Sequence, residues 1–93
     1  MKNSEMKLIM AVLRDEVTEA VTQSLITSGF RVTRIASTGG FLRRGSTTLM
    51  IGVDDGKVEQ AIELMRRQCP APTEGGQKYV TLFVLHVAHF EQL

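Results

Sequence analysis

The chain has 93 residues, a formal net charge of +1, 43% hydrophobic residues and a single cysteine, Cys69. The near balance of charge argues against general nucleic-acid binding, and the lone cysteine excludes an intramolecular disulfide and fits a reducing cytoplasm. The length predicts one domain over residues 1–93 whose core is small enough to favour oligomers, and no apolar run approaches the roughly 20 residues that cross a bilayer.

The chain begins with the pattern of a strand followed by a helix. Residues 7–13 carry an apolar run that is typical of a strand buried on both faces. Residues 16–28 have the three-and-four spacing of one helical face, which Asp15 or Thr18 is expected to cap and Gly29 to end. The predicted buried face consists of Val17, Ala20, Val21, Ser24, Leu25 and Ser28.

Two further strands are predicted around a glycine-rich loop. Residues 30–36 are β-rich, and alternation places Arg31 and Thr33 on one face and Arg34 on the other. These polar side chains either supplement a binding site or keep an exposed edge strand from aggregating. Residues 47–53 form the third predicted strand, which we expect to pair with the second as a hairpin.

The second half repeats the order of helix and strand. Residues 56–69 place apolar side chains on one helical face, and the proline- and glycine-rich residues 70–77 form a loop. Residues 78–87 form the fourth predicted strand, with Val80, Leu82 and Val84 facing one way and Thr81, Phe83 and Leu85 facing the other.

The predicted order is strand, helix, strand, strand, helix, strand. Two right-handed crossovers then give an α+β, ferredoxin-like fold: a four-stranded antiparallel sheet with both helices on one face. The uncovered face of such a sheet is a large apolar patch, because the first and last strands are apolar on both sides. We therefore expect a homo-oligomer in which open sheet faces pack together.

The loop over residues 37–48 is the strongest candidate for a binding site. Its glycines allow the backbone to turn N–H groups toward a ligand, and Arg43 and Arg44 can bind phosphate. Phe41 and Leu42 can contact a flat base. The loop is neither a P-loop nor a dinucleotide fingerprint, because both motifs are absent. It is either a sensor of a phosphate-containing ligand, with a nucleotide as the leading candidate, or a hairpin loop whose glycines serve only its geometry.

Other reactive side chains indicate no enzyme. His86 and His89 are three residues apart, but no further ligands complete a metal set, so surface histidines are the simpler interpretation. Cys69 is expected to be a buried small hydrophobe on the second helix. Capping explains Asp54, and Phe83 is expected in the core unless it stacks on a base. No catalytic set is present, and we expect neither an enzyme nor a cofactor.

Several segments together resemble the bacterial cyclic di-AMP receptor family of PII-like signalling proteins. They are Met6-Lys7-Leu8-Ile9, the run over residues 30–43 with its Thr-Gly-Gly-Phe-Leu-Arg sequence, Gly45-Ser46-Thr47-Thr48, Phe83-Val84-Leu85, Phe90 and Gln92. The resemblance implies a ferredoxin-like homotrimer that binds cyclic di-AMP in clefts between subunits. It also implies a receptor rather than an enzyme, in which ligand binding rearranges loops that contact a downstream protein.

The resemblance also implies roles for individual residues. Arg31 and Thr33 are expected near the phosphates and the ribose, residues 40–42 around the base, Phe83 against the adenine, and Gln92 reaching it from the tail. The complete expected set of ligand-binding residues is Arg31, Thr33, Gly39, Gly40, Phe41, Leu42, Arg43, Ser46, Thr48, Phe83 and Gln92.

The chain departs from the family pattern in two places. Gly29 and Ser46 stand where well-known members carry asparagine, and residues 69–78 form a short connection in place of a long loop. Loss of an amide removes hydrogen bonds that read a ligand. The alternative interpretation is a PII-like trimeric interaction module that has lost or changed its nucleotide.

Overall fold

The strands and helices follow one another in the predicted order, and each predicted end lies within two residues of the observed one. The computed structural model describes residues 5–35, 45–71, 76 and 78–93. The elements are β1 (Met6–Arg14), α1 (Asp15–Thr27), β2 (Arg31–Ile35), β3 (Ser46–Asp54), a 3₁₀ turn η1 (Asp55–Lys57), α2 (Val58–Arg67) and β4 (Val80–His86).

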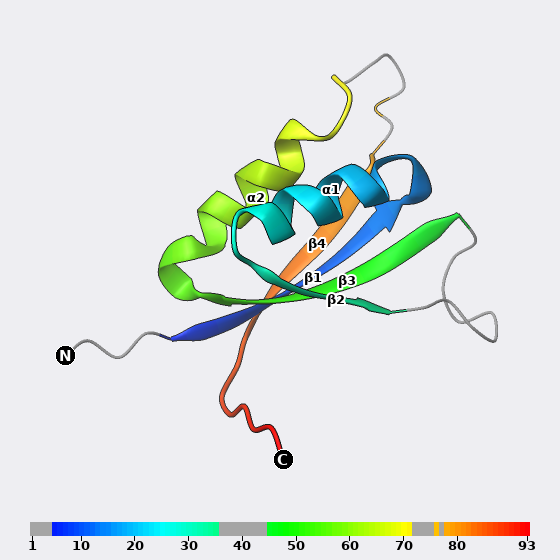
Figure 1. The fold of residues 1–93 in the computed structure, drawn as a ribbon. Helices are drawn as coiled ribbons and strands as arrows, with labels where there is room; N and C mark the ends of the chain where they lie inside the picture. Colours follow the sequence, from blue (N-terminus) through cyan, green and yellow to red (C-terminus); the bar gives the residue numbers. More distant parts are fainter. Residues whose placement is uncertain (1–4, 36–44, 72–75, 77) are drawn as a thin grey trace.

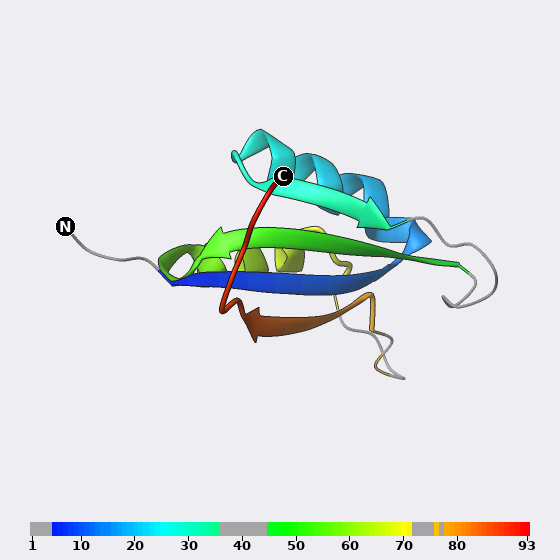
Figure 2. The same cartoon turned by 90° about the horizontal axis from the view of Figure 1, so that it is seen from below.

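The four strands form one antiparallel sheet in the order β2-β3-β1-β4. β2 and β3 form the predicted hairpin, and both helices cover the same face of the sheet (Figure 1). Figure 2 views the sheet from the side opposite the helices. The predicted ferredoxin-like arrangement is confirmed. Among the described residues, no helix is long and apolar enough to cross a membrane.

The core lies between the helices and the two central strands. Alternate residues of β1 and β3 point toward the helices, and each side chain of the core is at most 4% exposed. Because the sheet is covered on one face only, this core is a single layer. It consists of Ile9, Ala11 and Leu13 of β1, Leu49, Ile51 and Val53 of β3, Val17, Val21 and Leu25 of α1, and Ala61 and Met65 of α2.

The buried face of α1 differs from its prediction. Thr18 and Thr22 are buried, whereas Ala20 is exposed. The Thr18 hydroxyl donates to the carbonyl of Arg14 (3.0 Å), and the Thr22 hydroxyl donates to that of Thr18 (2.7 Å). Threonine can be buried in a helix because it satisfies its hydroxyl in this way. The expected side-chain cap by Asp15 or Thr18 is wrong, since the N-terminus of α1 has none.

Gly29 ends α1 in a left-handed conformation, as its position predicted. Its φ is 92°, its N–H donates to the carbonyl of Ile26 (2.9 Å), and the N–H of Phe30 donates to that of Leu25 (3.0 Å). These two bonds form a Schellman motif, which satisfies the last carbonyls of the helix. The motif also turns the chain directly into β2, so Gly29 fixes where Arg31 emerges.

We expect Gly29→Ala to lower the free energy of unfolding by about 1 kcal/mol, because a β-carbon is unfavourable at left-handed φ. Urea unfolding followed by circular dichroism measures the change. Gly56→Ala is the matched control: its added β-carbon has open space and its φ is outside the left-handed region. That variant should remain within about 0.5 kcal/mol of the parent chain. Equal losses in both variants would contradict the role of Gly29.

Candidate functional site

The open face is the side of the sheet that neither helix covers (Figure 2). Strand alternation and register assign its residues. Across the sheet, one row runs Arg31, Gly52, Leu8, Leu85, and the next runs Thr33, Met50, Met10, Phe83. The face also includes Met6, Val12, Ile35, Ser46, Thr48, Asp54 and Thr81.

Four predicted ligand-binding residues lie on the β2–β3 side of the open face. Arg31 and Thr33 are exposed at the edge, Ser46 is half-buried, and Thr48 is only 4% exposed. Ser46 is six residues along β3 from Gly52, the partner of Arg31, a separation of about 20 Å. Arg31 and Thr33 are therefore neighbours on one face of β2, whereas Ser46 at the start of β3 is remote from Arg31.

Phe83 lies on the opposite edge of the same face. Thr33 and Phe83 share a row across all four strands, which separates their backbones by about 14 Å. Phe83 is 56% exposed and so is not a core residue. Gln92 belongs to the exposed tail after β4, which leaves the sheet on the side away from the helices (Figure 1). One chain therefore does not bring Phe83 beside Arg31.

The two arginines of β2 have different environments. Arg34 points to the helix side, where its guanidinium lies 2.9 Å from the carboxylate of Glu19 in α1. Arg31 points to the open face, and no ion pair or side-chain hydrogen bond joins it to another described residue. The structure therefore separates Arg34 from the candidate site and leaves Arg31 available. The predicted residues 39–43 of the glycine-rich loop lie outside the described residues.

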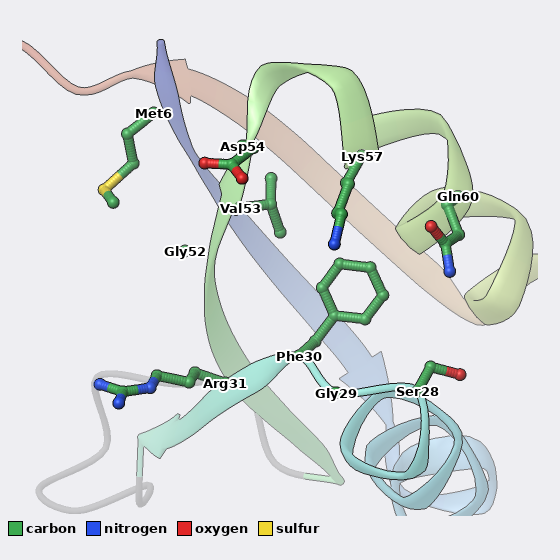
Figure 3. Close-up of a pocket in the computed structure, with 10 residues that line it drawn as sticks. All are labelled: Met6, Ser28, Gly29, Phe30, Arg31, Gly52, Val53, Asp54, Lys57 and Gln60. Carbon is green, nitrogen blue, oxygen red and sulfur yellow. The ribbon is translucent and has the colours of Figure 1, made fainter. Parts of the chain in front are cut away.

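A hollow of about 190 Å³ adjoins Arg31 at the start of β2 (Figure 3). The turn after α1, the end of β3 and the start of α2 form its walls, and Lys57 and Gln60 contribute their side chains to it. The sequence placed Lys57 at the start of the helix predicted over residues 56–69 and gave it no role in a site. The predicted β2–β3 hairpin contained the missing signal, because antiparallel pairing places the end of β3, and hence the turn that follows it, beside the start of β2.

The other reactive side chains do not assemble a metal site or a nucleophile. Nδ1 of His86 lies 3.4 Å from the Lys7 ammonium, and Nε2 of His89 lies 2.8 Å from the Glu91 carboxylate. Among the described residues, no three potential metal ligands gather. Burial raises the pKa of the half-buried Cys69 thiol, which disfavours the reactive thiolate.

Comparison with known proteins links this architecture to one family. A family model described as cyclic-di-AMP receptor matches residues 6–74. A functionally unknown protein from Pediococcus pentosaceus ATCC 25745 is 27% identical, with a TM-score of 0.76 over 98% of this chain and 100% of that chain.

Two more distant structures share the fold alone. A DUF3240 family protein from Shewanella baltica OS155 is 13% identical, with a TM-score of 0.68 over 98% of this chain and 99% of that chain. A Bacillus cereus protein related to NIF3 is 16% identical, with a TM-score of 0.69 over 96% of this chain. The match covers only 27% of the Bacillus cereus chain, so it concerns one part of that protein.

Proposed function

The chain belongs to the cyclic-di-AMP receptor family, and on this premise we propose that it binds cyclic di-AMP, or a related nucleotide, in clefts between the subunits of a homotrimer. The family is one of receptors, so the chain is a binding protein and not an enzyme. We further propose that residues 1–93 act as one ligand-sensing domain in the cytoplasm. Occupancy of the clefts is relayed to a downstream protein through loop rearrangement.

The environment of Arg31 is the observation that supports this proposal. Arg31 is exposed on the open face beside Gly52, which has no side chain to compete for the space, and it has no ion-pair partner among the described residues. Thr33 projects from the same face two residues further along β2 and offers a hydroxyl. A guanidinium fork with a neighbouring hydroxyl suits a phosphodiester and a ribose.

The open face supports a ligand cleft shared between copies of the chain. Phe83 and Leu85 are 56% and 44% exposed on this face, and Phe90 and Leu93 are exposed in the tail. Exposed apolar groups of this kind mark interfaces, and a domain of this size gains stability from association. Because Thr33 and Phe83 occupy opposite edges of one sheet, a partner subunit is needed to bring the ring of Phe83 to the nucleotide beside Arg31.

Titration calorimetry with cyclic di-AMP tests the proposal, with AMP as the matched ligand control. We expect saturable binding of cyclic di-AMP, and a thermal-shift assay should show stabilisation of about 2.7 kcal/mol when the free ligand is a hundredfold above Kd. AMP should stabilise the protein far less, because it offers half of the contacts. If millimolar cyclic di-AMP gives neither heat nor a thermal shift, the proposed ligand is wrong.

A second candidate is a trimeric PII-like interaction module with a lost or changed nucleotide ligand. It is favoured by position 29, where glycine contributes no side chain and the neighbouring space is open. Under this alternative the oligomer persists in sedimentation velocity while cyclic di-AMP fails to bind. Saturable binding of cyclic di-AMP contradicts it.

A further inference from the structure

The hollow beside Arg31 has an apolar floor and a polar rim (Figure 3). Phe30 and Val53 provide apolar surface, and the side chains of Lys57 and Gln60 reach in from the start of α2 with their nitrogen ends near the Phe30 ring. Small-molecule pockets usually measure about 300–1,000 Å³. At about 190 Å³, this hollow fits one functional group of a ligand and not a second nucleoside.

The cations around the hollow are unusual in this molecule because they are unpaired. Among the described lysines and arginines, those without an ion pair are Arg31, Lys57 and Lys78, and the first two line this hollow. Asp54 is the carboxylate of the lining, and it forms no ion pair with either cation. Figure 3 shows Lys57 and Gln60 directed toward the side of the Phe30 ring, whereas the Arg31 side chain extends away from them. The hollow therefore has one ammonium that is unpaired among the described residues and an amide donor, and Arg31 lies at its border with the open face.

We propose that this hollow is a phosphate subsite in which Lys57 and Gln60 bind a phosphate group of the nucleotide that contacts Arg31. The proposal rests on the proposed function for the identity of the ligand. An ammonium provides a point charge for a phosphate oxygen, and the Gln60 amide donates to a second oxygen. Open space at Gly29 leaves the entrance clear of side-chain atoms. Lys57 is then a specificity-determining residue that favours phosphate-bearing ligands over nucleosides.

The phosphate group in the hollow can belong to the nucleotide or be free inorganic phosphate, and a competition experiment distinguishes these two cases. If the nucleotide supplies the group, inorganic phosphate weakens the apparent affinity for cyclic di-AMP in the parent chain and has no effect in Lys57→Ala. If free phosphate occupies the hollow independently, phosphate shifts the thermal transition of the parent chain without competing. Either result supports a phosphate subsite, and only the first assigns it to the nucleotide.

Calorimetry with cyclic di-AMP on Lys57→Ala and Gln60→Ala tests the residues directly. We expect Lys57→Ala to weaken binding about tenfold, as loss of a charged hydrogen bond does, and to make the affinity less sensitive to salt. Gln60→Ala should weaken it less. Arg67→Ala is the control, because it removes one positive charge from the end of α2, ten residues after Lys57, a distance of about 15 Å. It should bind like the parent chain.

Two outcomes distinguish failure of the subsite from failure of the proposed function. If the parent chain binds cyclic di-AMP and both variants bind equally well, the subsite is wrong and the function stands. If the parent chain binds no nucleotide, inorganic phosphate becomes the probe: a phosphate-induced thermal shift that Lys57→Ala abolishes supports the subsite, and no shift overturns it. Circular dichroism establishes that each variant is folded before binding is measured.

Discussion

Arg31→Ala is expected to weaken cyclic di-AMP binding at least a hundredfold. The guanidinium is exposed, unpaired among the described residues and directed to the open face. Charge-assisted, bidentate contacts to phosphate are among the strongest hydrogen bonds in proteins, at about 1.5–3 kcal/mol for each bond to a charged group. Loss of two such bonds accounts for the expected effect, which titration calorimetry measures.

Arg34→Ala provides a control on the same strand. Arg34 lies three residues from Arg31 but points to the other face, where it pairs with Glu19 at 2.9 Å. Breaking this exposed ion pair costs stability of at most about 1 kcal/mol and should leave the affinity within about a factor of two, since no ligand contact is lost. Comparable losses of affinity in both variants would show that net charge, and not position on the open face, determines binding.

Arg31→Lys refines this prediction. Lysine keeps the positive charge but lacks the planar fork, so we expect it to recover only part of the affinity. Full recovery by lysine would mean that long-range attraction supplies the contribution of Arg31. The three variants on β2 thus separate charge, geometry and side-chain direction without changing the core.

The alternation of side chains along a strand predicted which face of the sheet each residue of β4 points to. Val80, Leu82 and Val84 do face the helices, and Phe83 and Leu85 face away from them. The exposure of Phe83 was harder to predict, because an aromatic residue in an apolar strand is usually buried. At position 83 it is exposed because β4 is an edge strand and the open face has no covering layer.

The parts that the sequence did not predict depend on register and on contacts between elements. The threonines of α1 replaced Ala20 on its buried face because their hydroxyls bond to the preceding turn, which a count of apolar residues ignores. Lys57 was not predicted as a site residue because Phe30 and Arg31, which line the same hollow, belong to a different part of the chain. The predicted hairpin places the turn after β3 beside the start of β2, but the register that decides which residues meet becomes specific only in the folded sheet.

Phe83→Glu is expected to dissociate the proposed homotrimer into monomers and to abolish ligand binding with it. Phe83 lies in the same row as Met10 and Met50, so it would meet a partner across apolar surface. Burying an unpaired carboxylate there costs several kcal/mol, which lowers the association constant by a factor of about a hundred or more. Sedimentation velocity over a range of protein concentrations measures the assembly, and calorimetry measures the binding.

Ile26→Glu is the matched control for this variant. Ile26 is 49% exposed on α1 and Phe83 is 56% exposed on the open face, so each monomer should tolerate the charge with a loss of stability near or below about 1 kcal/mol. Only the Phe83 variant should change its sedimentation coefficient. If Phe83→Glu sediments like the parent chain, the open face does not form the interface. If it dissociates and still binds cyclic di-AMP with parental affinity, the assembly is real but the ligand site lies within one subunit, and the cleft between subunits must be abandoned.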